Sequence, residues 1–192
     1  MRRAEAVLTR LSRFAAPRAR LAMLRAIRPL RGLAVGIPTD APLEGVYWPV
    51  PGSRPDDPAD PDASDAGLLY ALPLLPADAS DVRACLDGTR RIFTAHGFEP
   101  AITLNLLDDR CLEGVISLAF PRTDPDRVRA GRACIREAER FYLDAGWPPY
   151  RVGIDSMDLL TDPDDPYWRI VRDLKNTLDP DHIIAPGRYN LD

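Results

Sequence analysis

The stretch from Gly67 to Gly146 constrains the fold most, because its hydrophobic pattern changes between strand-like and helix-like spacing in a regular order. Apolar residues at every second position indicate a strand, whereas apolar residues three and four positions apart indicate a helix. The order is strand, helix, strand, strand, helix, over residues 67–75, 80–97, 101–107, 111–120 and 124–146. The turn residues between these segments support the same order.

Those turn residues predict where the segments begin and end. Ser80 or Asp81 is expected to cap the first helix, and Gly97 suits the left-handed position that follows a helix. Asp124 followed by Pro125 predicts an N-cap and a first-turn proline for the second helix. Residues 108–110, Asp-Asp-Arg, predict a tight turn between two antiparallel strands.

A further strand after residue 146 would complete a ferredoxin-like arrangement. We therefore predict an α+β fold with an antiparallel sheet that carries both helices on one face and leaves the other face free. Asp164, Asp165 and Pro166 precede an apolar pattern over residues 167–178. This pattern predicts a C-terminal helical segment after the sheet.

The front of the chain has a different composition. Residues 1–31 carry nine of the 25 Lys and Arg residues but only one of the 29 acids. Their apolar residues have helical spacing from position 3 to about 28, and Pro17 predicts a kink or a second helix start. Such a segment fits an organelle transit peptide, a membrane-surface helix or a helix packed on an acidic body. Residues 46–49 are expected to form a short strand, and residues 51–65 a solvated loop.

Composition excludes several classes of protein. A chain of 192 residues that is 45% hydrophobic can bury the core of one domain, with or without an appendage. No apolar run is long enough for a membrane span, and Phe14 is the one aromatic residue among the N-terminal arginines, which argues against nucleic-acid binding. Cys85, Cys111 and Cys134 lack C-x-x-C spacing, which argues against a disulfide framework and a zinc site. A reducing cytoplasm is the simplest location, and no metal is expected.

Two motifs near the end of the chain resemble a known family. Residues 174–187, Leu-Lys-Asn-Thr-Leu-Asp-Pro-Asp-His-Ile-Ile-Ala-Pro-Gly, resemble the C-terminal signature of FAD-linked oxidases. The sequence Pro149-Tyr150-Arg151 narrows the resemblance to the vanillyl-alcohol oxidase and 4-cresol dehydrogenase family. Residues 36–39 and the pair at 47–48 resemble the front of that family's cap domain, so the resemblance covers most of the chain.

This resemblance implies an FAD-dependent oxidoreductase that oxidises 4-alkylphenols or hydroxybenzyl alcohols. In the family, the Tyr-Arg pair binds the phenolic oxygen as a phenolate while a hydride passes from the benzylic carbon to the flavin. The residue types suit that role, because Arg151 is always charged and offers a planar fork of donors, and Tyr150 adds another donor. The alternative is that Tyr150 is a half-buried aromatic residue and Arg151 a surface cation.

The sequence departs from the family pattern at two strands. Members with covalent FAD use a histidine or tyrosine where Leu68 stands here, so noncovalent FAD is expected. Tyr70 lies on the same strand face and is either a shifted tether or a core aromatic residue. Glu113 occupies the region that usually brings a histidine toward the substrate, so it is a candidate base or polar wall. Asn105 on the neighbouring strand is a candidate for substrate binding.

The resemblance also implies partners. In the family, FAD is held mainly by an N-terminal domain, and this sequence contains neither G-x-G-x-x-G nor a P-loop. We therefore expect an FAD-binding domain or subunit as partner, a small phenolic substrate, and no efficient oxidation by this chain alone. The resemblance leaves open whether the protein forms a homo-oligomer. The remaining candidates are Tyr47 and Trp48 for the substrate and Pro186, Gly187 and Arg188 for the flavin.

These expectations divide the chain into a basic N-terminal helical segment, a cap (substrate) domain and a segment that docks on an FAD-binding domain, at 1–31, 32–146 and 147–192. Two alternatives remain. One is a noncatalytic remnant or interaction module with the same fold. The other is half of an FAD-linked 2-hydroxy-acid dehydrogenase, in which Arg151 binds a carboxylate.

Overall fold

The structure is a computed structural model that describes residues 9, 14–57 and 60–189. The chain divides into two compact units, Met1–Ala66 and Gly67–Asp192, and each unit is described by itself. No helix among the described residues is long and apolar enough to cross a membrane.

The first unit is helical. Helix α2 covers Ala15–Ala34 and places Pro17 in its first turn, where a missing N–H costs little, so the helix begins close to the proline at which a kink or a second start was predicted. The helix continues beyond the predicted end at position 28, and the expected helical pattern before position 14 lies almost wholly outside the described residues. Three short helical elements follow, η1 (Ala41–Leu43), α3 (Glu44–Tyr47) and η2 (Pro61–Ala63).

The strand predicted over residues 46–49 is wrong, because residues 46–47 end helix α3 and residues 48–49 form a turn. The N–H of Leu43 donates to the carbonyl oxygen of Asp40 at 2.9 Å, and α3 follows directly. Apolar and aromatic residues favour a strand only where another strand can pair with them. The described part of the first unit offers no such partner before β1 begins at Ala66.

The second unit is built on an antiparallel sheet around one long strand. Strand β4 (Cys111–Pro121) pairs on one side with β3 (Ala101–Leu106) and on the other with β1 (Ala66–Ala71) and β2 (Leu74–Pro76). The predicted single strand over 67–75 is thus interrupted, since Pro73 has no N–H to donate. The carbonyl oxygen of Pro73 still accepts from the N–H of Gly114 at 2.8 Å, so β1 and β2 follow one line along β4.

The strand expected after α5, which would complete the ferredoxin-like sheet, is reduced to one β-bridge. Pro149 pairs antiparallel with Pro73, flanked by hydrogen bonds from Leu74 N–H to Pro148 O and from Tyr150 N–H to Leu72 O, each at 2.8 Å. This bridge has the position and direction of the last strand in a ferredoxin-like sheet. The two consecutive prolines cannot donate to a ladder, which accounts for its shortness. The ferredoxin-like α+β fold is confirmed, with its last strand truncated.

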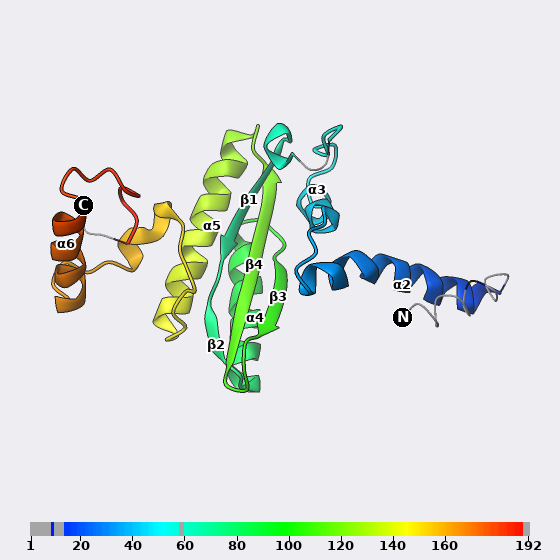
Figure 1. The fold of residues 1–192 in the computed structure, drawn as a ribbon, viewed down its shortest axis with the longest axis horizontal. Coiled ribbons are helices and arrows are strands. Elements are labelled where there is room, and N and C mark those ends of the chain that lie inside the picture. The colour runs from blue at the N-terminus through cyan, green and yellow to red at the C-terminus, as the bar shows by residue number, and fades with distance from the viewer. Residues whose placement is uncertain (1–8, 10–13, 58–59, 190–192) are drawn as a thin grey trace. The chain divides into compact units, whose positions relative to one another are not determined.

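Helices α4 (Ala79–Ala95) and α5 (Pro125–Asp144) both cover one face of the sheet (Figure 1). The N-cap of α4 is Asp78, whose carboxylate accepts from the N–H of Ser80 at 2.7 Å, so the prediction of Ser80 or Asp81 as cap was two or three residues late. The N-cap of α5 is Asp124, as predicted. Gly97 (φ 72°) and Gly146 (φ 80°) take the left-handed conformation that favours glycine after a helix.

The core lies between these helices and the sheet. Phe93, Leu75 and Leu118 are fully buried in it. A buried hydrogen bond of 2.6 Å joins the hydroxyl groups of Thr89 on α4 and Tyr142 on α5, which satisfies both polar groups inside apolar surroundings.

The C-terminal part of the second unit is helical, as predicted. A 3-10 helix, η3 (Ile154–Leu159), follows the bridge, and α6 (Pro166–Leu178) follows it with Asp165 as N-cap. Helix α6 buries Trp168 but exposes Ile170, Leu174 and Leu178. An apolar row left open at i, i+4 and i+8 is a surface suited to packing against another element.

Candidate functional site

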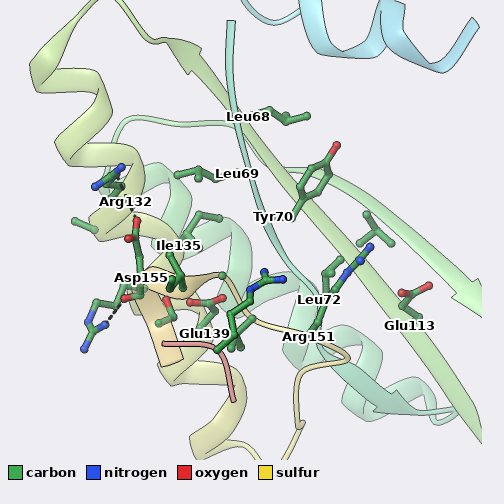
Figure 2. Close-up of a pocket in the computed structure, with 18 residues that line it drawn as sticks. Leu68, Leu69, Tyr70, Leu72, Glu113, Arg132, Ile135, Glu139, Arg151 and Asp155 are labelled. Carbon is green, nitrogen blue, oxygen red and sulfur yellow. Dashed lines mark hydrogen bonds and ion pairs between the residues drawn. The ribbon is translucent and has the colours of Figure 1, made fainter. Parts of the chain in front are cut away.

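A pocket of about 770 Å³ opens beside β1 in the second unit. Figure 2 shows that its lining side chains come from β1, β4, α5 and the chain after residue 150. The lining residues are Leu68, Leu69, Tyr70, Leu72, Glu113, Val115, Arg132, Ala133, Ile135, Arg136, Glu139, Arg151, Val152, Gly153, Ile154, Asp155, Ser156 and Arg188.

The truncation of the last strand after one β-bridge explains why the pocket lies beside β1. After the hydrogen bond from Tyr150 N–H to Leu72 O, the chain leaves the edge of β1 and enters η3. Among the described residues, no strand pairs with the outer edge of β1 between Leu68 and Ala71. The space that a full last strand would fill is therefore bordered by β1, by α5 and by the residues after Tyr150, which turn away from β1.

Arg151 and Tyr150 occupy different positions relative to this pocket. Arg151 lines it, while Tyr150 does not and leaves 60% of its side chain exposed. The guanidinium carbon of Arg151 lies 5.6 Å from the centroid of the Tyr150 ring, within reach of a cation–π contact. No ion pair involves Arg151 within the part of the chain that the structure describes. Its charge is thus available to an anionic group in the pocket.

Glu113 and Asn105 form a polar pair on neighbouring strands. They are directly opposite each other in the register of β3 and β4, and the Asn105 amide donates to Glu113 Oε2 at 3.2 Å. Glu113 lines the pocket, whereas Asn105 does not line it and contacts Glu113 instead. The hydrogen bond orients the carboxylate that sequence analysis singled out.

Leu68 and Tyr70 both line the pocket from β1, two residues apart on the same strand face. Tyr70 is about half exposed, and burial of the rest of its ring raises the pKa of its hydroxyl. The phenol therefore stays protonated at neutral pH and can donate a hydrogen bond.

The tail after α6 returns to the same region. Arg188 lines the pocket, whereas Pro186 and Gly187 do not. The N–H of Val152 donates to the Tyr189 hydroxyl at 3.2 Å, which holds the end of the tail beside the segment after Arg151. A Cβ added at Gly187 would lie 3.6 Å from the side chain of Ile154, an ordinary contact.

Asp179 gives the tail its local shape. Its carboxylate accepts from the N–H groups of Ile183 and Ile184 at 3.0 and 2.9 Å and pairs with Lys175. The hydrogen bond from Lys175 and those from the backbone lower the pKa of Asp179 to about 2. The aspartate of the tail motif is thus a structural cap that folds residues 179–184 back on α6.

Tyr47 and Trp48 belong to the first unit, at the end of α3. Tyr47 is buried, while 81% of Trp48 is exposed. Their assignment to substrate binding stays a prediction.

Sequence reasoning missed the contribution of α5. Arg136 Nη1 donates to the carbonyl oxygen of Asp155 and to Asp158 Oδ1, both at 2.8 Å, and Arg132 lies 3.5 Å from the Asp155 carboxylate. The hydrogen bond from Arg136 lowers the pKa of Asp158. These contacts attach η3 to α5 and so form one wall of the pocket. Arginines four positions apart on a helix are common on solvated faces, so the spacing alone did not identify them.

Glu139 is the other residue that sequence reasoning missed. It lies within the apolar stripe of α5, between Ile135 and Tyr142, and only 4% of it is exposed. Burial raises the pKa of its carboxyl group, against a smaller opposite effect of a hydrogen bond from Ser156. An acidic residue inside a buried stripe is uncommon, and this signal was present in the sequence.

The stability of the protein is expected to depend on pH through Glu139. Because its folded pKa is raised above the ordinary value of 4.5, the folded state binds more protons than the unfolded state above that pH. Glu139→Gln should therefore increase the unfolding free energy relative to the wild type as pH rises from 4.5. The gain is about 1.4 kcal/mol for each pH unit, up to the folded pKa.

Denaturant unfolding at a series of pH values between about 4 and 8 measures this difference. Glu99→Gln is the matched control, because Glu99 is exposed. A difference between Glu139→Gln and the wild type that does not change with pH would contradict the expectation.

Two curated proteins are similar to this chain in sequence. The chain is 33% identical to 1'-carboxy-chondrochloren decarboxylase from Chondromyces crocatus over 157 residues, which is 82% of this chain and 29% of that protein. It is 24% identical to the 4-cresol dehydrogenase [hydroxylating] flavoprotein subunit from Pseudomonas putida over 127 residues, which is 66% of this chain and 24% of that protein. The chain thus spans about a quarter of the length of these relatives. No family model matches it.

Two solved structures share the fold. The 4-ethylphenol oxidase from Gulosibacter chungangensis, in complex with isoeugenol, superposes with a TM-score of 0.60 at 20% identity, over 71% of this chain and 27% of that chain. The p-cresol methylhydroxylase with substrate bound superposes with a TM-score of 0.59 at 24% identity, over 66% of this chain and 24% of that chain.

The fold and the comparisons define a class: the chain has the fold of the cap regions of FAD-linked oxidases, an antiparallel sheet with its helices on one face. Within that class, the resemblance to the vanillyl-alcohol oxidase and 4-cresol dehydrogenase family is confirmed.

Proposed function

We propose that this chain is the cap and C-terminal portion of an FAD-dependent oxidoreductase that oxidises 4-alkylphenols or hydroxybenzyl alcohols. The observation that carries the proposal is the pocket beside β1, which places Arg151, Glu113 and Tyr70 around one space of about 770 Å³. A pocket of this size lies within the usual range of small-molecule binding sites. The names of two relatives, a 4-cresol dehydrogenase and a 4-ethylphenol oxidase, support the substrate class.

Arg151 binds the phenolic oxygen in this proposal. A fixed positive charge favours the phenolate over the phenol, and it stabilises the electron-rich ring from which a hydride leaves the benzylic carbon. Tyr150 adds a donor once its exposed ring is covered by the partner domain. Glu113, oriented by Asn105, serves as polar wall or base for the proton that the substrate or an added water releases.

The described residues fit the edge of a flavin ring system but not its diphosphate. Leu68, Leu72 and Val115 offer apolar surface in the pocket, and Tyr70 offers a protonated hydroxyl. No Gly-rich phosphate loop occurs in the sequence. FAD would supply the hydride acceptor, and Pro186, Gly187 and Arg188 would meet it from the tail. Leu68 offers no side chain for a covalent bond, so we propose noncovalent FAD.

An FAD-binding domain or subunit is proposed to supply the rest of the FAD site. Residues 147–192 are proposed to dock on that domain or subunit, and residues 32–146 to act as the cap over the substrate. The exposed row of α6 is apolar enough for such docking. We assign no function to the basic segment 1–31.

Flavin absorbance tests this proposal. The purified chain alone should be colourless, and the chain coexpressed with the coding sequence immediately upstream should copurify as a yellow complex that oxidises 4-ethylphenol. A colourless preparation in both cases would favour the noncatalytic module.

A second candidate is the loss of carbon dioxide from a carboxylate substrate, because the relative with 33% identity is a decarboxylase. Arg151 and Arg188 both line the pocket, so it can hold a carboxylate. Carbon dioxide released per flavin reduced distinguishes the candidates, since 4-alkylphenol oxidation releases none.

A further inference from the structure

Glu139 has one carboxylate oxygen that is buried and has no hydrogen-bond partner. Its Oε2 makes no hydrogen bond with any described residue, although 96% of the residue is removed from solvent. A buried polar atom without a partner destabilises the fold, because it has lost its hydrogen bonds to water. Such atoms are uncommon in folded proteins and call for a specific explanation.

The groups around Glu139 do not supply that partner. Ser156 on η3 engages the carboxyl group, while Arg136 on the same helix is committed to Asp155 and Asp158. Glu139 also borders a second cavity, on the side of Tyr142, of only about 10 Å³. A cavity of that size is at the lower limit for one water molecule. Of the two spaces that Glu139 borders, the main pocket is the one with room for a ligand.

The lining of the pocket selects the chemistry of that partner. Four arginines line it, Arg132, Arg136, Arg151 and Arg188, which disfavours a cationic ligand group. The carboxyl group of Glu139 disfavours an anion beside it whenever it is ionised. A neutral hydroxyl group suits both states, because it can donate to a carboxylate and accept from a carboxylic acid.

The apolar lining selects the rest of the ligand. Leu69, Ile135 and Val152 line the same pocket as Glu139, and Figure 2 shows the side chains of Ile135 and Glu139 projecting from α5 toward it. A ligand with an apolar body and a hydroxyl group at one end matches this lining.

We propose that Glu139, held by Ser156, is a binding site for a second hydroxyl group of the substrate, one that is separate from the phenol. The substrate is then a 4-alkylphenol whose side chain carries an alcohol group. This inference deepens the proposed function and rests on it for the phenol end of the ligand. Glu139 selects the substrate and takes no part in hydride transfer.

Paired ligands that differ by one hydroxyl group test the proposal. Binding of 4-ethylphenol and of 4-(2-hydroxyethyl)phenol to the full chain is measured by protein-observed NMR titration. The wild type should bind the alcohol about 5- to 10-fold more tightly, the effect of one additional hydrogen bond. Equal affinity, or no binding of either compound at millimolar concentration, would overturn the proposal.

Two substitutions of Glu139 separate its role from general packing. Glu139→Met keeps the length of the side chain without its oxygens and should abolish the preference for the alcohol. Glu139→Gln keeps an acceptor and a donor and should retain most of it. If Glu139→Met does not fold, Ser156→Ala removes the hydroxyl that holds the carboxyl group and should reduce the preference. A preference that survives both Glu139→Met and Ser156→Ala would also overturn the proposal.

The variant Arg151→Ala shows whether a negative result concerns the proposed hydroxyl site at Glu139 or the proposed phenol site at Arg151. If the proposed function holds, Arg151→Ala weakens both ligands alike and leaves their ratio unchanged. If Arg151→Ala has no effect while the wild type still prefers the alcohol, the phenol assignment fails and the Glu139 site stands. If Arg151→Ala weakens both ligands and the wild type shows no preference, the Glu139 site fails and the phenol assignment stands.

Discussion

Arg151→Ala is expected to lower kcat/KM for 4-ethylphenol by about 10²–10³-fold in the complex of this chain with its FAD-binding partner. The removal of one donor aimed at a developing oxyanion typically has an effect of this size. Arg151 lines the pocket and pairs with no described carboxylate, so its charge is directed to the ligand. Steady-state kinetics on the purified yellow complex measure the effect, and separate kcat from KM.

Two further variants make the Arg151 experiment specific. Arg151→Lys keeps the charge but loses the planar donor fork, so its loss of activity should be intermediate. Arg91→Ala removes an exposed arginine from α4, outside the pocket, and should leave kcat/KM within about twofold. A loss of less than tenfold for Arg151→Ala, or equal losses for Arg151→Ala and Arg91→Ala, would remove Arg151 from the mechanism.

Phe93→Ala should destabilise the chain by about 3–5 kcal/mol, the usual cost of truncating a fully buried phenylalanine. Phe93 lies on α4 with no exposed surface, in the core that includes Leu75 and Leu118. The lost ring leaves a cavity that the close packing of α4 and α5 cannot easily fill. For example, a Cβ added at Gly88 would lie 2.2 Å from the ring of Phe141, so the two helices are already in tight contact.

Urea unfolding followed by circular dichroism measures the free energy of unfolding for each variant. Leu178→Ala is the control, since 79% of Leu178 is exposed and the change should stay within about 0.5 kcal/mol. A loss of under 1 kcal/mol for Phe93→Ala would mean that the sheet and the helices do not share one core.

Local structure was largely predictable because its causes are local. The N-cap at Asp124 and the glycines after both helices follow from the hydrogen bonds and dihedral angles of a few adjacent residues. The same holds for the turn at 108–110, where the Asp108 carboxylate accepts from the N–H groups of Arg110 and Cys111. Period-two and helical spacing then predicted the order of the elements.

Predictions that depended on distant partners failed or were incomplete. The segment 46–49 has strand-forming residues, but it contains the end of α3 at Tyr47 and the turn after it, and the described first unit offers no strand to pair with. The run 67–75 was predicted as one strand, whereas Pro73 divides it into β1 and β2. Pro73 has no N–H to donate, and the pairing with β4 determines that this missing donor interrupts the strand.

The sequence by itself determined the ferredoxin-like order of elements, and its motifs carried the resemblance to FAD-linked oxidases. It also singled out Arg151, Glu113, Leu68, Tyr70 and Arg188, but had no means to place them around one pocket. Only the tertiary structure decided that, because the pocket exists where the last strand ends after one bridge and the chain turns away from β1. It also decided the environment of Glu139, since burial and an unpartnered oxygen depend on what α5 packs against, and this is a property of the whole fold.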